Sequence, residues 1–135
     1  MNKKRYVKPL VFIIIILAFV MGMIYKYTIS MSNLPEGELI YTSTSNSKEY
    51  TFNGYLVNSG AMVAYAVRGE IVNNKTKEKR NIYWDYHVNT VNVKWIGEKT
   101  IIVNDKKIDD IDRDKYDFRN DKKYDADYNI EHFMK

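Results

Sequence analysis

The sequence of 135 residues contains no cysteine. This absence excludes disulfides, catalysis by a thiol, metal sites built from thiolates and a lipid-modified N-terminal cysteine. It does not decide the compartment, because secreted bacterial proteins and cytosolic proteins can both lack cysteine. The location of the protein must therefore be inferred from other features of the sequence.

Acidic residues are absent from the first 27 positions, where five of the 21 Lys and Arg residues lie (Lys3, Lys4, Arg5, Lys8 and Lys26). The rest of the chain holds 16 basic and 17 acidic residues, so the net charge of +4 comes from the N-terminal segment. Nucleic-acid binding needs a basic patch on the folded part of a protein. The charge distribution therefore gives no reason to expect a nucleic-acid partner.

Charged residues are also absent from Pro9 to Tyr25. A helix that crosses a bilayer takes about 20 residues, with a range of about 17–25. The run is apolar on all faces, and the rest of the chain is too small to wrap such a helix completely. We predict a transmembrane helix at residues 9–27. Residues 1–8 are expected in the cytoplasm, because most of the basic residues precede the run.

A cleaved signal peptide is the alternative to a retained anchor. The apolar part of a signal peptide is usually about 7–15 residues and ends at small residues. This run is longer and ends in Met23, Ile24 and Tyr25, and the following Thr28 to Ser30 is a poor cleavage site. Retention is therefore the prediction, which places the protein in the cell membrane as a single-pass chain with its C-terminal part outside.

A series of short runs rich in Val, Ile, Tyr, Trp and Thr follows, as strands prefer, after a predicted tether at residues 28–37. The runs cover residues 38–44, 50–58, 62–72, 80–88, 91–96 and 100–104. Parallel strands need crossovers of a dozen residues or more, and the turns between these runs are shorter. We therefore expect a mainly β fold, in which one small twisted antiparallel sheet, a meander of about six strands, occupies residues 38–119. Residues 120–135 are predicted to form a charged, partly disordered tail.

Alternation assigns faces to the fourth run. Ile82, Trp84, Tyr86 and Val88 share one face, and Asn81, Tyr83, Asp85 and His87 share the other. We interpret the second face as solvent-facing, and we expect the sheet to curl so that Trp84 and Trp95 are buried. Gly54 and Gly69 interrupt two strands, which suggests a bulge, a bend or a close backbone approach.

Polar residues on these strands are the candidates for function. Asp85 next to His87 is the beginning of a general base, but no cysteine and no G-x-S-x-G motif supplies a nucleophile. Arg68 and Glu70 share a face and are expected to pair with each other or across strands. We predict no catalytic residues and no cofactor, and we name a possible interaction surface made of Arg68, Glu70, Tyr83, Asp85 and His87.

Asp110, Asp112 and Asp114 form D-x-D-x-D, the start of a calcium loop. An EF-hand needs glycine at the sixth position and glutamate at the twelfth, where this chain has Lys115 and Asp121. We therefore predict no metal site, and we keep cation binding through residues 109–121 as an alternative.

Two stretches, "AYAVRGE" (Ala64 to Glu70) and "NIYWDY" (Asn81 to Tyr86), carry a family resemblance. With their surroundings from Leu34 to Arg119, they resemble the domain of unknown function 5412 family, small membrane-anchored proteins of Gram-positive bacilli. The resemblance implies an N-terminal anchor followed by one compact domain that includes Tyr116 to Arg119. It implies no activity.

The expected function is that of a non-enzymatic binding module outside the cell membrane. Its partner would be an envelope protein or a cell-wall polymer, within the roughly 35 Å that a tether of about ten residues can reach. A small envelope hydrolase that uses Asp85 and His87 is the second hypothesis, and cation binding is the third.

Overall fold

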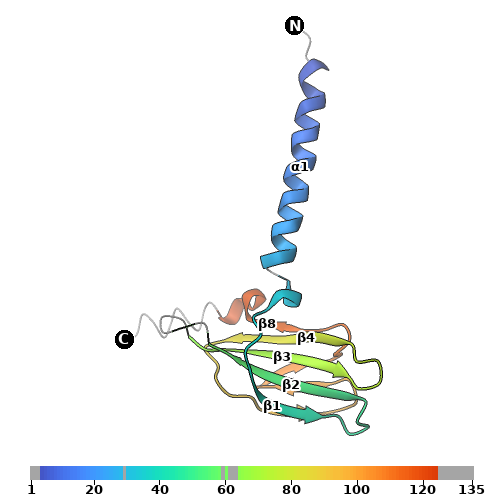
Figure 1. Ribbon diagram of the computed structural model, residues 1–135, viewed down its shortest axis with the longest axis vertical. Coiled ribbons are helices and arrows are strands. Elements are labelled where there is room, and N and C mark those ends of the chain that lie inside the picture. Colours follow the sequence, from blue (N-terminus) through green and yellow to red (C-terminus); the bar gives the residue numbers. More distant parts are fainter. Residues whose placement is uncertain (1–3, 29, 59, 61–63, 125–135) are drawn as a thin grey trace. The chain divides into compact units, whose positions relative to one another are not determined.

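A computed structural model of the chain describes residues 4–28, 30–58, 60 and 64–124 (Figure 1). It divides into two parts, Met1–Asn33 and Leu34–Lys135. The first part contains helix α1 (Lys4–Thr28) and the 3₁₀ turn η1 (Met31–Asn33). The second part contains every strand found among the described residues and is called the β unit below.

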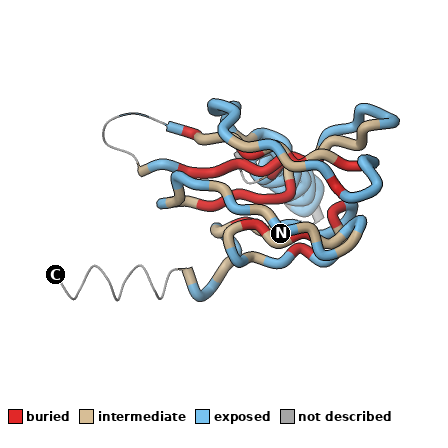
Figure 2. Tube along the Cα trace, turned by 90° about the horizontal axis from the view of Figure 1, so that it is seen from below, coloured by how far each residue is buried: buried red, intermediate tan, exposed pale blue. Residues whose placement is uncertain are grey.

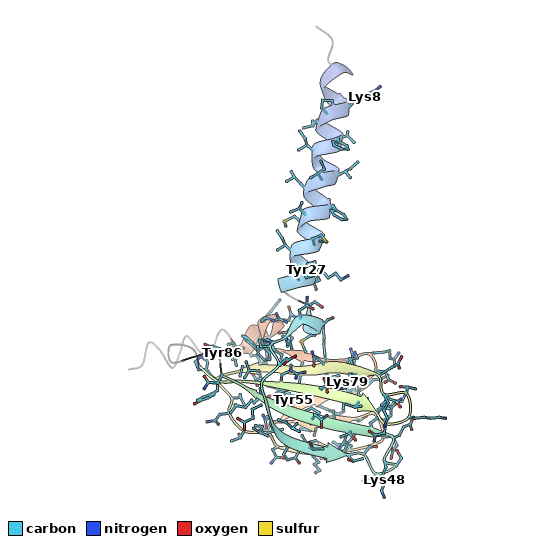
Figure 3. All side chains as sticks on the ribbon, viewed as in Figure 1. Lys8, Tyr27, Lys48, Tyr55, Lys79 and Tyr86 are labelled. Carbon is cyan, nitrogen blue, oxygen red and sulfur yellow. The ribbon has the colours of Figure 1, made fainter. Side chains whose placement is uncertain are left out.

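Helix α1 is built almost entirely from apolar residues, and its stretch Val7–Tyr27 is long and apolar enough to cross a membrane. Its large apolar side chains are exposed on all sides, from 42% for Met23 to 70% for Phe19 (Figure 3). The apolar helix predicted at residues 9–27 is therefore confirmed as a helix, and it begins somewhat earlier than expected.

The β unit consists of two sheets. The five-stranded sheet has the order β1-β2-β3-β4-β8, and the three-stranded sheet has the order β5-β6-β7. The strands of the larger sheet are β1 (Glu38–Thr44), β2 (Tyr50–Val57), β3 (Ala66–Asn73), β4 (Lys79–Tyr86) and β8 (Tyr116–Asp117). Those of the smaller sheet are β5 (Val93–Trp95), β6 (Ile101–Val103) and β7 (Lys106–Ile108), and the 3₁₀ turn η2 (Phe118–Asn120) follows β8.

Local sequence explains the tight turns between these strands. The turn between β6 and β7 has positive φ at both central residues, Asn104 (44°) and Asp105 (67°). Asn and Asp tolerate this conformation, and such a turn matches the twist of a two-residue hairpin. Between β3 and β4, the side chain of Asn73 accepts hydrogen bonds from the backbone N–H groups of Lys75 and Thr76.

The core lies between the two sheets, where the buried residues of the two layers meet (Figure 2). The face of the larger sheet that points to the smaller sheet is called the core face, and the opposite one the outer face. Phe52, Val67 and Tyr83 of the larger sheet, and Ile101 and Val103 of the smaller one, have no exposed surface. Gly69 permits this packing, because a Cβ atom there would lie 2.6 Å from the Phe52 ring.

The mainly β, antiparallel fold is confirmed, but the prediction of a single sheet of about six strands is wrong. In the part of the chain that the structure describes, eight strands form two sheets, because the chain turns after β4 and places its own apolar strands over the core face. The pair β4–β8 is parallel. The sequence reasoning excluded parallel pairs, yet the segment that carries the smaller sheet is itself a long enough crossover.

The interpretation of the β4 faces is also wrong. A bulge shifts the register, so that Glu70 pairs with Asn81 while Gly69 pairs with Tyr83. The side chain of Asn81 therefore lies on the outer face, where it bonds Arg68. The side chain of Tyr83 lies in the core and has no exposed surface. Asp85, expected in solvent, is only 7% exposed. The bulge places two residues opposite one, which separates Asn81 from the face of Tyr83. Tyr83 and Asp85 keep their alternation, and their face is buried because the smaller sheet packs on it.

Parts of the predicted tether and of the predicted C-terminal tail contact the β unit. The end of the predicted tether, Glu36 and Gly37, lies against the larger sheet, and a Cβ at Gly37 would meet the Leu56 carbonyl oxygen at 2.6 Å. At the other end, β8 and η2 place Tyr116 to Arg119 within the fold, as the family resemblance implied. The ring of Tyr124 lies 5.0 Å from that of Phe118. Residues 125–135 of the predicted tail lie outside the described residues.

Candidate functional site

A buried cluster of polar groups occupies the outer face of the larger sheet. Arg68 and Glu70 lie two residues apart on β3, so both side chains point to this face. They are 7% and 8% exposed, and Nη1 of Arg68 lies 3.4 Å from Oε2 of Glu70. The predicted ion pair is therefore confirmed, but it is buried rather than exposed.

The remaining donors of Arg68 are also used. Its Nη1 donates to Oδ1 of Asn81 at 2.9 Å, and its guanidinium lies 4.0 Å from the centre of the Tyr55 ring. Tyr55 in turn donates its hydroxyl to Glu70 at 3.3 Å. Figure 3 shows Tyr55 in the middle of the larger sheet, where these groups meet. We call Arg68, Glu70, Asn81 and Tyr55 the Arg68 cluster.

The Arg68 cluster holds the chain segment that precedes β1. Nε and Nη2 of Arg68 donate to the backbone carbonyl of Glu36 at 3.1 and 3.0 Å, so that two N–H groups of the guanidinium share one acceptor oxygen. The segment of residues 34–37, called the strap below, runs in front of the sheet before it enters β1 (Figure 1). A planar guanidinium is suited to such a two-pronged contact.

A second polar network lies on the core face. The hydroxyl of Tyr83 donates to Oδ2 of Asp85 at 2.8 Å, and the backbone N–H of Tyr86 donates to Oδ1 at 3.0 Å. Asn104 donates its side-chain amide to the Tyr83 oxygen at 3.3 Å. Burial raises the pKa of the Asp85 carboxyl above its ordinary value, and burial next to Asp85 raises the pKa of the Tyr83 phenol strongly.

The network continues to the short strand β8. The rings of Tyr83 and Tyr116 stack at 5.5 Å, and the Tyr116 hydroxyl donates to Asp121 at 3.0 Å. Lys106 completes it, with its Nζ 3.4 Å from the Asp121 carboxylate and 4.7 Å from the centre of the Tyr116 ring. Because β8 is only two residues long, these side-chain contacts hold it in place alongside its backbone pairing with β4.

Asp85 and His87, the pair named in the alternative hypothesis of a hydrolase, do not lie together. Both carboxylate oxygens of Asp85 are bonded within the core network. His87 lies beyond the end of β4, is exposed, and has a φ of 59° that turns the chain away from the strand direction. Its ring packs 4.3 Å from that of Tyr86. The common strand face that the sequence suggested for Asp85 and His87 therefore does not exist.

The family comparison applies to both parts of the chain. Residues 3–121 match a Family of unknown function (DUF5412). The chain belongs to this family. The match begins before α1 and ends after η2, so the DUF5412 region includes both the apolar helix and the β unit. No curated protein and no solved structure matches the chain.

The two stretches that carried the DUF5412 resemblance have structural roles here. "AYAVRGE" supplies Arg68 and Glu70 to the cluster that holds the strap, and Gly69 to the close contact with Phe52. "NIYWDY" supplies Asn81 to the same cluster, and the core network through Tyr83 and Asp85. These stretches therefore join the strap, the two sheets and β8 into one packed unit.

The carboxylates of the Asp-rich turn at residues 110–114 have hydrogen-bond and ion-pair partners within the chain. Asp110 accepts from the backbone N–H of Asp112 at 3.0 Å and pairs with Arg113 at 2.8 Å. Asp112 pairs with Lys99 at 2.5 Å, and Asp114 accepts from the backbone N–H of Asp110 at 3.0 Å. Among the described residues, no three His, Cys, Asp or Glu side chains are grouped so that they could hold a metal ion.

The five residues of the predicted interaction surface are thus divided among three places. Arg68 and Glu70 lie under the strap, Tyr83 and Asp85 lie in the core, and only His87 is exposed. The sequence reasoning missed the partners of these residues, which are Tyr55, Asn104, Tyr116, Asp121 and the carbonyl of Glu36. No sequence signal marks a backbone carbonyl or a residue that a crossover brings close, so only the structure identifies them.

Proposed function

We propose that this DUF5412 protein is anchored in the cytoplasmic membrane by α1 and presents its β unit outside, where the unit binds another component of the envelope. The observation that supports the membrane anchor is the exposure of the large apolar side chains around α1. Each such side chain gains about 1.5–3 kcal/mol when it leaves water for apolar surroundings. A bilayer provides these surroundings along the whole length of Val7–Tyr27.

The charges at the two ends of α1 support the orientation. Lys3, Lys4, Arg5 and Lys8 precede or begin the apolar stretch, and only Lys26 closely follows it. Short segments rich in Lys and Arg stay in the cytoplasm. The β unit is therefore placed on the outer side in this proposal.

Binding rather than catalysis is supported by how the polar groups are used. The carboxylate of Asp85 is buried and bonded on both oxygens, and the guanidinium of Arg68 is bonded to the strap and to Glu70. A general base must reach the proton that it removes from a substrate. The buried position of Asp85 thus weighs against the alternative hypothesis of a hydrolase that uses Asp85 and His87. The proposed partner is an envelope protein or a wall polymer near the membrane.

The absence of cysteine allows a clean test of the topology. Lys75→Cys places a single thiol on an exposed turn of the β unit, and Lys4→Cys places one at the start of α1. In intact cells, a membrane-impermeant maleimide should label Lys75→Cys, and it should label Lys4→Cys only after lysis. The labelled Lys75→Cys chain should keep its full-length mass. Labelling with the opposite pattern, or a labelled chain that has lost its N-terminal segment, would refute the anchor and its orientation.

Crosslinking in intact cells tests the binding role. A photoreactive reagent attached to Lys75→Cys should trap a discrete envelope component, which His87→Ala and Asp85→Asn should leave unchanged. Recovery of the uncrosslinked chain alone under efficient crosslinking would refute the binding role. If His87→Ala abolished a cellular phenotype while fold and crosslink were kept, the hydrolase hypothesis would be favoured instead.

A further inference from the structure

The strap covers the Arg68 cluster although residues 35–37 of the strap are themselves exposed. Gly37 has a φ of 83°, and a Cβ atom there would lie 2.6 Å from the Leu56 carbonyl oxygen. This backbone conformation and this close approach both require glycine. The strap is therefore held on the sheet by a glycine that lets it come close and by the two hydrogen bonds from Arg68 to the Glu36 carbonyl.

The guanidinium of Arg68 is fixed by groups of the sheet as well as by the strap. Its Nη1 donates to Asn81 at 2.9 Å and lies 3.4 Å from the Glu70 carboxylate. Its carbon atom Cζ lies 4.0 Å from the centre of the Tyr55 ring. These contacts use Nη1 and one flat side of the guanidinium, and the edge formed by Nε and Nη2 is used by the strap. The edge would thus keep its orientation if the strap moved away.

The Nε–Nη2 edge of Arg68 suits a carboxylate better than it suits the strap. Its two N–H groups share one neutral oxygen of Glu36, at 3.1 and 3.0 Å. A carboxylate gives each N–H group an oxygen of its own, in the planar arrangement that guanidinium groups prefer. Hydrogen bonds between ionised groups are also about twice as strong as those to a neutral carbonyl.

The charges around Arg68 also favour an anion. Glu70 lies 3.4 Å from Arg68 and 3.8 Å from Lys79, so one negative charge faces two positive charges (Figure 3). The three groups together carry one positive charge. The carboxylate of Glu36 is on the strap and would leave with it. A single carboxylate bound to Arg68 would therefore balance the charge of the cluster.

We propose that the Nε–Nη2 edge of Arg68 binds the C-terminal carboxylate of a peptide, and that the strap occupies this site when no peptide is bound. A peptide is favoured over other carboxylates because the site already holds a peptide main chain through the carbonyl of Glu36. A chain that ended at this carbonyl would place its terminal carboxylate on Arg68. The proposal gives the proposed binding role a site and a ligand class, and it rests on that role.

A synthetic peptide tests the site directly. Acetyl-SNLPQ follows Ser32–Glu36 with glutamine at the last position, so its C-terminal carboxylate is its only acidic group. The same peptide with a C-terminal amide is the matched control. Binding is measured by NMR on the full chain in detergent micelles, through the Nε–H signal of Arg68. The chain carries Gly37→Ala, because the added Cβ would clash with the Leu56 carbonyl and displace the strap.

The acid peptide should bind the Gly37→Ala chain about tenfold more tightly than the amide peptide does, because it replaces neutral with charge-assisted hydrogen bonds. It should bind the wild-type chain about tenfold more weakly than the Gly37→Ala chain, because the tethered strap competes at a high effective concentration. Pro35→Gly, which loosens the free strap, is the second variant and should tighten binding in the same direction if Gly37→Ala does not fold.

Side-chain variants test the role of the guanidinium. Arg68→Lys in the Gly37→Ala chain keeps the charge but loses the planar edge, so the preference for acid over amide should fall to about threefold or less. Arg113→Met, which removes an exposed arginine, should leave the preference unchanged. Equal binding of the acid and amide peptides to the folded chain, or a preference that Arg68→Lys does not change, would overturn the proposal.

Two further outcomes separate the ligand and the role from the site. Glucuronate should bind at least about tenfold more weakly than the acid peptide, and equal binding would refute a peptide as the ligand. Equal affinity of the acid peptide for the wild-type, Gly37→Ala and Pro35→Gly chains would refute competition by the strap. Peptide binding without a crosslinked envelope component in cells would support the site and refute the cellular role, whereas a crosslinked component without peptide binding would refute the site.

Discussion

Removal of Arg68 gives the sharpest test of how the strap is held. Arg68→Met leaves Glu70 buried, with a hydroxyl from Tyr55 at 3.3 Å and the mostly exposed Lys79 at 3.8 Å as its remaining partners. Loss of one member of a buried ion pair typically costs about 3–5 kcal/mol. Because Tyr55 and Lys79 offset part of this cost, we expect the free energy of unfolding to fall by about 3 kcal/mol.

Urea unfolding of the full chain in detergent micelles measures this change. Trp84 and Trp95 both lie in the β unit, so their fluorescence reports its unfolding and is insensitive to α1. Thermal unfolding gives a second measure. In a domain of this size, a loss of 1 kcal/mol in the free energy of unfolding lowers Tm by about 4–8 °C, so Arg68→Met should lower Tm by about 12–24 °C. Arg113→Met is the matched control, because the Arg113 side chain is 82% exposed and its ion pair with Asp110 is at the surface. It should leave the midpoint unchanged.

Two further variants separate the buried charge from the grip on the strap. Arg68→Met combined with Glu70→Gln removes both charges and should recover about 1–2 kcal/mol relative to Arg68→Met alone, as coupled neighbours do. Arg68→Lys keeps the charge but cannot hold the Glu36 carbonyl with two N–H groups, so it should lie between wild type and Arg68→Met. An Arg68→Met chain within about 0.5 kcal/mol of wild type would refute the reasoning, because that is the range of ordinary surface substitutions.

Three other predictions follow from the core and from the Asp-rich turn. Gly69→Ala places a Cβ 2.6 Å from the Phe52 ring and should destabilise the β unit by about 1–3 kcal/mol in urea, whereas Gly97→Ala, with no atom within 4 Å, should have little effect. Burial raises the pKa of Asp85 above 3.8, so the folded chain retains this proton to higher pH than the unfolded chain. The contribution of this group favours folding below pH 3.8 and is lost as the pH rises through the raised pKa. Wild type should therefore lose stability relative to Asp85→Asn over this window, and a difference that is independent of pH would contradict the assignment. Calcium should not change the thermal midpoint relative to EDTA, because the carboxylates of residues 110–114 are engaged within the chain; a calcium-dependent rise would show a site.

The parts of the fold that the sequence predicted correctly depend on local signals. The length and apolar character of residues 9–27 predict a helix, and the runs at residues 38–44 and 50–58 match β1 and β2 closely because both have clear turn residues at their ends. Gly69 was assigned a bulge or a close approach, and it has both. These features depend on a few neighbouring residues, so they can be read from the chain itself.

The errors share a different cause. Asn81 was grouped with Tyr83 and Asp85 because alternation counts every residue as one step, and the bulge beside Asn81 breaks that count. No sequence feature near Asp85 indicates that a second sheet covers it, because the strands of that sheet come after Val88. The residues of the predicted interaction surface lie in separate places for the same reason. They were grouped because they are neighbours on strands, whereas their partners lie far away in the chain.

The amino-acid sequence alone predicts an apolar helix followed by a small, mainly antiparallel β unit, and it predicts that Arg68 and Glu70 share one strand face and form ion pairs, with each other or across strands. Hydrophobic runs, turn residues and neighbours on one strand carry this information, because the forces behind them act over short stretches of chain. The packed structure was needed to show that the strands divide into two layers, that β8 joins β4 in parallel, and that Arg68 pairs with Glu70 while it holds the strap. Each of these depends on which distant segments bury each other's apolar surface and satisfy each other's polar groups, and that choice is made by the whole chain when it packs.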